Sequence, residues 1–249
     1  MANAAEGALK RILEFWSVNP RINDFGKIRV ELDKPRAGTY ASVFVWGKVD
    51  GRKTRIVKIF GVEEKPQMMY HKLTHAIFPN DDKMIRNMMG IPMEVKFGNP
   101  LTFPMCGYPN DAWVVAFRKV KSYIPLEELG PDHEQWGMST KGGLPVVVNK
   151  ARQHTAYAES GSLGMYLLNT YGVEKVKAFN RLSHQKERPW TEAFGLSLGE
   201  LEKSWIRFLD SIQKAQEEKV ATLTKLLQRD PDAACPTRPS DKPSKPRKR

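Results

Sequence analysis

Two histidines stand four residues apart in the segment from Pro66 to Gly98, where the chain concentrates side chains able to do chemistry. Acidic residues followed by Pro66 indicate that a helix begins there. On that helix His71 and His75 leave the same face about one turn apart, so the two imidazoles can hold a metal ion. Glu94 is a carboxylate able to return to them. The alternative is a histidine pair on a partly buried helix, each ring with an ordinary hydrogen-bond partner.

Short helices and strands are expected to position this pair. The histidine helix should end at Pro79 and Asn80, and a second short helix should run from about 81 to 89, closed by Gly90. Before them, three runs at 27–32, 40–49 and 53–60 have strand character, and Asp50-Gly51 predicts a hairpin between the last two. An N-terminal helix is expected over about 5–17.

The segment HKLTH, residues 71–75, differs at one position from the zinc-peptidase signature HExxH. Here the sequence resembles the gluzincin metallopeptidases and their peptidase MA-like relatives. The resemblance implies zinc held by His71, His75 and Glu94, and it puts Lys72 at the position of the general base. A lysine is cationic at neutral pH and offers no acceptor. Peptide hydrolysis is therefore expected to be lost or weakened, as in a pseudoenzyme.

Three further side chains are candidates for the same site. Tyr157 and His154, on a helix expected over 150–171, could stabilise an oxyanion, and a core or surface position is the alternative for each. His133 lies in a region from 121 to 149 that is rich in turn-forming residues, and such a long excursion is often functional. It could approach the site or be an exposed loop histidine.

The C-terminal half is expected to be helical. Apolar residues recur at helical spacing up to Gly172, and a second helix should follow over about 173–184. Ser197 and Glu200 form a capping box before an apolar stripe. The segments AYAESGSLGMYLLNTYG and EAFGLSLGELEKSWIRFL also look like the helical subdomain of peptidase MA-like proteins. The resemblance thus covers about 27–209.

These elements predict an α+β protein that is zincin-like: a small mixed sheet with the metal-site helix, followed by a helical subdomain. The expected organisation is an N-terminal helix within 1–26, a peptidase MA-like domain over 27–228 and a disordered basic tail over 229–249. Within the domain, 27–120 should hold the sheet and metal-site helices, 121–149 the loop excursion and 150–228 the helical subdomain.

The charge of the chain is strongly positive. The formal net charge is +12, of which the tail 229–249, with seven Lys and Arg against three Asp, supplies +4 and the rest +8. Basic charge can indicate nucleic acid, yet no zinc-finger spacing, RNP pattern or Gly-x-x-Gly clamp accompanies it. A solvated basic protein is favoured, so nucleic acid is not the expected partner.

The N-terminus and the cysteines bear on the compartment. The first residues lack a signal peptide, and no apolar stretch is long enough to span a bilayer. A cytoplasmic location is expected, with export as the alternative if the start is truncated. Cys106 and Cys235 belong to no CxxC pattern, and free thiols are expected.

Two functions from different classes remain open on the sequence. The first is a zinc metallopeptidase or a derivative of one, acting on a peptide or protein substrate, in which zinc polarises a carbonyl and activates water. The second is a non-enzymatic protein that uses the zincin scaffold to bind a peptide or a partner.

Overall fold

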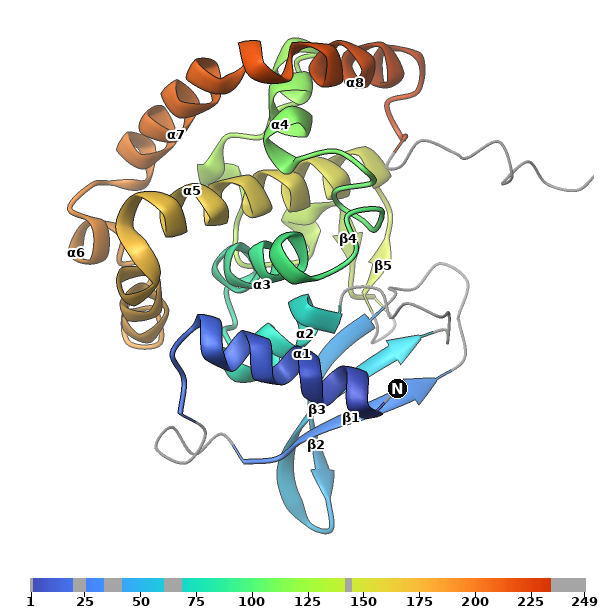
Figure 1. Cartoon of the computed structure of the whole chain (residues 1–249), viewed down its shortest axis with the longest axis vertical. Coiled ribbons are helices and arrows are strands. Elements are labelled where there is room, and N and C mark those ends of the chain that lie inside the picture. Colours follow the sequence, from blue (N-terminus) through green and yellow to red (C-terminus); the bar gives the residue numbers. More distant parts are fainter. Residues whose placement is uncertain (1, 20–25, 34–41, 61–68, 142–144, 234–249) are drawn as a thin grey trace, which may run out of the picture.

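A small sheet and a stack of helices make up the computed structural model, which describes residues 2–19, 26–33, 42–60, 69–141 and 145–233. Figure 1 shows the sheet at one end and the helices in layers beyond it. Helices α1 (Ala2–Phe15) and α2 (Met69–Ile77) pack together beside the sheet, and α3 (Lys83–Phe97) lies between α2 and α5 (Lys150–Leu182). The protein is therefore of the α+β class, as predicted.

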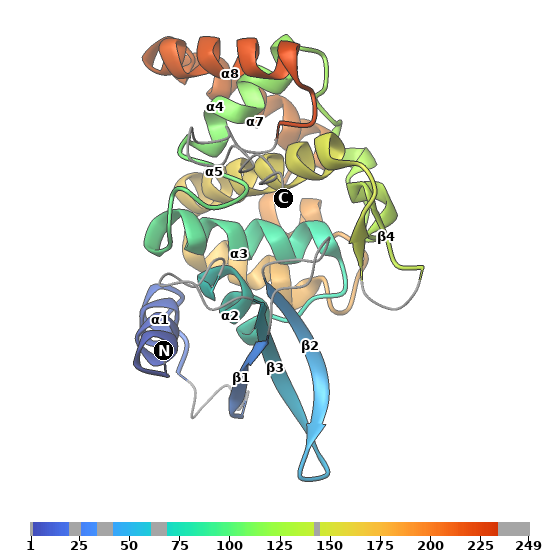
Figure 2. The ribbon, with the colours of Figure 1, turned by 90° about the vertical axis from the view of Figure 1, so that its right-hand side faces the viewer.

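Within the described residues the sheet contains three strands. They are β1 (Ile28–Asp33), β2 (Ser42–Val49) and β3 (Arg52–Phe60), in the order β1-β3-β2. Strand β2 runs antiparallel to β3, as the Asp50-Gly51 turn predicts, and β1 runs parallel to β3. Both turn residues have positive φ, 49° and 76°. Val57 and Ile59 of β3 are buried in the core, while the β2–β3 hairpin extends away from the helices (Figure 2).

The short helix expected over 81–89 is longer in the structure, where α3 extends to Phe97. The helix starts after Asp82, whose side chain caps it, and continues through Gly90 and Pro92 to Phe97. Pro92 has no N–H for the Met88 carbonyl, a loss that ordinarily breaks a helix. Here α5 packs closely on that point, since a Cβ atom at Gly164 would lie 2.1 Å from the Met88 oxygen. Tertiary packing thus maintains a helix that its local sequence disfavours.

The remaining helices cover the other side of α5. They are α4 (Asn110–Lys119), α6 (Trp190–Phe194), α7 (Leu198–Ile212) and α8 (Glu217–Arg229). The predicted helix end at Gly172 is present as a break inside α5, where φ is 82°. The predicted capping box of Ser197 and Glu200 is confirmed at the start of α7.

The excursion over 121–149 is packed against the body. It forms two short 3-10 turns, η1 (Leu126–Glu128) and η2 (Glu134–Trp136), and two short strands, β4 (Met138–Ser139) and β5 (Val146–Val147). Leu129 and Trp136 are completely buried. Because the Lys83 N–H donates to the Pro131 carbonyl at 3.1 Å, this region is joined to the start of α3.

Two sequence expectations concern membranes and thiols. No helix in the described ranges is both long and apolar enough to cross a membrane. Cys106 is disulfide-bonded, so the expected free thiol is wrong for this residue. Cys235 and most of the predicted basic tail lie outside the described residues.

Candidate functional site

His71 and His75 lie on the face of α2 that packs against α3. They are 0% and 3% exposed, and their ring centroids are 4.3 Å apart with the planes nearly perpendicular. Gly90 of α3 makes this arrangement possible, because a Cβ atom there would lie 2.3 Å from His71 Cδ2 and 2.8 Å from His75 Nε2. The predicted placement of both rings on one helix face is confirmed. Gly90, interpreted from sequence as a helix end, instead provides room for the imidazoles.

Asn87 is the side chain that faces the first ring. His71 Nε2 lies 2.9 Å from Asn87 Oδ1, and Asn87 Nδ2 donates to the Lys83 carbonyl at 2.7 Å. The second bond fixes the orientation of the amide, so His71 Nε2 carries the proton and donates it to Oδ1. Sequence analysis missed Asn87. Had α3 been extended past Gly90, the spacing 87–90–94 would have put Asn87 and Glu94 on one helix face.

Glu94 reaches α2 but directs its carboxylate to the backbone. Its oxygens accept the N–H of His71 at 3.3 Å and the N–H of Asn99 at 3.4 Å. Within the described part of the chain, no group of three or more His, Cys, Asp or Glu side chains could hold a metal ion. The structure therefore brings together two imidazoles and an amide, fewer than the three protein ligands of a catalytic zinc site.

Positive side chains surround the imidazole pair. Lys72 is 7% exposed, and burial, reinforced by Arg86 and opposed by Glu94, lowers its pKa to about 7. Burial is also the largest cause that lowers the pKa of His71, followed by the charge of Lys72. The pKa of His75 is lowered by burial and then by His71 and Lys72. Both rings are accordingly neutral at pH 7.

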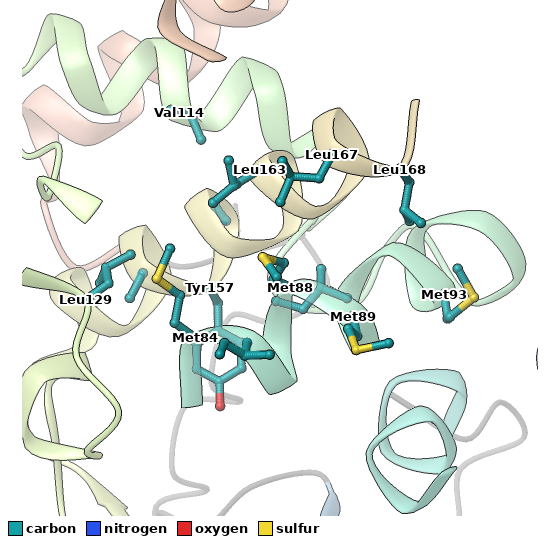
Figure 3. Close-up of a cluster of buried hydrophobic side chains, with 14 of the residues drawn as sticks. Met84, Met88, Met89, Met93, Val114, Leu129, Tyr157, Leu163, Leu167 and Leu168 are labelled. Atoms are coloured by element: carbon teal, nitrogen blue, oxygen red, sulfur yellow. The ribbon is translucent and has the colours of Figure 1, made fainter. Parts of the chain in front are cut away.

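Tyr157 and Lys83 complete the buried polar group. The Tyr157 ring centroid lies 6.3 Å from that of His71, and Lys83 Nζ donates to the Tyr157 hydroxyl at 3.1 Å. Figure 3 shows the Tyr157 ring extending from α5 past Met84, with its hydroxyl on the far side from Leu163. The predicted proximity of Tyr157 to the histidine pair is thus observed. Its role as an oxyanion donor stays a prediction.

His154 and His133 have different surroundings. His154 Nε2 lies 2.8 Å from the Pro104 carbonyl oxygen, and its ring packs against Trp113 at 4.3 Å, apart from the imidazole pair. Burial lowers its pKa to about 4. His154 therefore occupies a core position, which the sequence analysis gave as the alternative to an oxyanion role. His133 is half-buried, and burial together with Lys83 lowers its pKa to about 4. The excursion therefore brings His133 toward the site.

Comparison with known proteins adds no family. No protein-family model matches the chain, and neither a curated protein nor a solved structure matches it. The resemblance to the gluzincins therefore rests on HKLTH and on the helical segments quoted above.

Proposed function

We propose that this protein is metallopeptidase-like, with a zincin-like arrangement of sheet and histidine helix, and that it binds a peptide or protein partner without hydrolysing it. The observation that carries the proposal is the chemistry around the imidazole pair. Lys72 follows His71 directly, and Asn87 faces the His71 ring. Hydrolysis at zinc needs a third protein ligand and a base that accepts a proton from water. The Asn87 amide is a poor third ligand, and the Lys72 amine, with a pKa of about 7, is unprotonated in only about half of the molecules at pH 7.

Zinc, implied by the resemblance, does not fit the residues present as a catalytic ion. His71 Nε2 is engaged with Asn87, and Glu94 accepts backbone N–H groups. In its protonated form Lys72 adds a like charge beside the pair. At ~5 Å and an effective dielectric constant of ~20, Zn²⁺ and an ammonium repel by roughly 6–7 kcal/mol. We therefore expect His71 and His75 to hold zinc weakly.

The edges of the sheet are the proposed place for the partner. Among the described strands, β1 and β2 are the outer ones, each with a side that no described strand pairs. Leu32 on β1 and Trp46 on β2 are 46% and 45% exposed. An extended peptide can add to such an edge through main-chain hydrogen bonds while side chains of the strand give selectivity. Peptide binding needs neither zinc nor a general base.

The test is to incubate the purified protein with a defined library of synthetic peptides and identify both bound and cleaved species by mass spectrometry. We expect a subset of peptides to be retained intact, with casein uncleaved and bound zinc well below one ion per chain. The variant Trp46→Ala should retain fewer peptides, whereas Leu101→Ala, which removes an exposed apolar side chain from the segment between α3 and α4, should match the wild type.

Two outcomes would overturn the proposal. Chelator-sensitive cleavage of casein or of library peptides by the wild type would establish hydrolysis. Retention of no peptide at all would remove the binding function.

A further inference from the structure

The end of the β2–β3 hairpin, residues 46–55, is a two-stranded ribbon. Strand β1 pairs with β3 only from Arg55 to Phe60, so beyond Arg55 the described sheet narrows to β2 and β3 alone. Figures 1 and 2, two perpendicular views, both show this ribbon extending away from the helices. Its side chains are therefore placed to meet another molecule.

The ribbon is rich in cations. Its ten residues contain four Lys and Arg against one Asp, a net charge of +3. Lys48, Arg52 and Lys53 are exposed, and within the described residues no ion pair joins any of the three to a carboxylate. Lys58, nearer the helices, is instead paired with Glu31 at 3.3 Å. The ribbon therefore presents positive charge to solvent without a nearby acid to compensate it.

Three of the cations share one face of the ribbon with an aromatic ring. Trp46 lies opposite Arg55 in the register of β2 with β3, and Lys48 lies opposite Lys53. Directly opposite residues project from the same face of a sheet, and a like-charge pair in such positions is destabilising. Lys53 Nζ lies 4.5 Å from the centroid of the Trp46 ring, and Arg55 Cζ lies 5.3 Å from it. This face thus gathers cations around one ring, an arrangement that an anion would stabilise.

Trp46 differs from the other tryptophans of the chain. It is 45% exposed, whereas each of the other five is at most 4% exposed. Its ring meets that of Phe44 edge to face, with the centroids 5.9 Å apart. An exposed indole beside cations suits a nucleic-acid base that stacks on the ring while the adjoining phosphate reaches an ammonium or guanidinium group.

We propose that the ribbon binds single-stranded nucleic acid through the face that carries Trp46, Lys48, Lys53 and Arg55. Nucleic acid is not the expected partner on the sequence, where no recognition motif accompanies the charge. What favours it is the pairing of β2 with β3, which brings the cations together around an exposed ring. An acidic peptide would compensate the cations but would leave the indole without a flat partner.

This binding goes beyond the proposed function and does not depend on it. A peptide that adds to the sheet uses main-chain groups at an edge strand. The nucleic acid would contact side chains on one face of the ribbon. Failure of peptide retention therefore leaves the nucleic-acid inference standing, and failure of nucleic-acid binding leaves the proposed function standing.

The first experiment measures binding of the full chain to labelled single strands by fluorescence anisotropy. The probes are oligothymidylate and oligouridylate of about 12 nucleotides, a length within the range of known single-strand sites. Comparison of the two strands shows whether DNA or RNA is preferred. A duplex of the same length and polyglutamate, as an acidic peptide, are the competing probes.

Charge-matched variants separate the ribbon from the general positive charge of the protein. Lys48→Gln/Lys53→Gln removes two cations of the ribbon, and Lys219→Gln/Lys225→Gln removes two exposed lysines of α8, at the far end of the molecule in Figure 1. For two lost phosphate contacts we expect binding to weaken roughly 10- to 30-fold at ~0.1 M salt, and the slope of log K against log salt to become shallower by about 1.4. The α8 variant should stay within about twofold of the wild type.

The second experiment follows the stacking on Trp46. Because the other tryptophans are buried, quenching of tryptophan fluorescence by a bound strand should come from this ring. Trp46→Ala should weaken binding by about 5-fold or more, the effect of losing one stacked base. Trp46→Phe keeps an aromatic ring, so it should retain most of the affinity while losing the quenching.

Four outcomes would overturn the inference. The first is that the wild type binds neither single strand. The second is that both ribbon variants, Trp46→Ala and Lys48→Gln/Lys53→Gln, bind as tightly as the α8 variant. The third is that the duplex binds more tightly than the single strands and is insensitive to Trp46→Ala, which would exclude stacking. The fourth is that polyglutamate binds as tightly as either strand, which would assign the face to acidic peptides.

Discussion

Replacing Lys72 by methionine should stabilise the protein at neutral pH, and the gain should disappear as the pH rises. Burial lowers the pKa of Lys72 from 10.5 to about 7 in the folded chain. Between these values the unfolded chain holds a proton that the folded chain releases, so the free energy of unfolding rises with pH over this window. One pKa unit corresponds to about 1.36 kcal/mol. The shifted pKa of Lys72 therefore lowers the free energy of unfolding by roughly 4 kcal/mol at pH 7 and by less than about 1 kcal/mol at pH 10.

The assay is urea unfolding followed by circular dichroism at several pH values between about 7 and 10. We expect the free energy of unfolding of the wild type to increase by up to about 3 kcal/mol more than that of Lys72→Met over this range. Lys96→Met is the control, since its side chain is exposed. If Lys72→Met showed the same pH dependence as the wild type and no gain at pH 7, the reasoning about the buried amine would be refuted.

Three further outcomes follow from the site and its packing. Lys72→Glu alone should leave zinc weakly bound. The double variant Lys72→Glu/Asn87→Asp adds a carboxylate beside the His71 ring and should retain one zinc per chain after dialysis. Equal zinc content of the two variants, measured by mass spectrometry, would contradict this. Gly90→Ala should destabilise the protein by about 1–3 kcal/mol, because the added Cβ atom collides with both imidazoles. Gly199→Ala is the control, since a Cβ atom there meets nothing within 4 Å. Equal melting temperatures of the two variants would contradict this prediction. The pKa of His154 is lowered from 6.5 to about 4 in the folded protein, so the free energy of unfolding should fall by up to roughly 3 kcal/mol as the pH drops through this range. Urea unfolding measured at the two ends of the range should show a smaller fall for His154→Asn.

The elements that could be predicted from the sequence are those fixed by local chemistry. Asp50-Gly51 must adopt positive φ angles, Gly172 breaks a helix, and Ser197 with Glu200 forms a reciprocal cap, and each acts within a few residues. The shared helix face of His71 and His75 is equally local. No distant contact is needed to infer any of them.

The errors come from contacts between distant segments. Gly90 has the composition of a helix end, yet α3 passes through it because the α2 rings fill the space beside it. Pro92 favours a break, yet α5 packs at Gly164 against the carbonyl that Pro92 leaves without its usual donor. A sequence pattern contains no information on which helix will lie opposite, so the end of α3 could not be placed correctly.

The continuation of α3 also changes what surrounds the predicted metal site. Once α3 continues, residues 83, 87, 90 and 94 share one face at helical spacing. Along that face Lys83 donates to Tyr157, Asn87 faces His71, Gly90 provides room for both rings, and Glu94 receives the His71 N–H. The carboxylate lies toward one end of this row and the buried amine at the other, with the amide between them. In this order the group that faces the His71 ring is the amide oxygen of Asn87, and no carboxylate of α3 stands there as a third metal ligand. The register of α3 therefore supports the proposal that this pair does not hold a catalytic zinc ion.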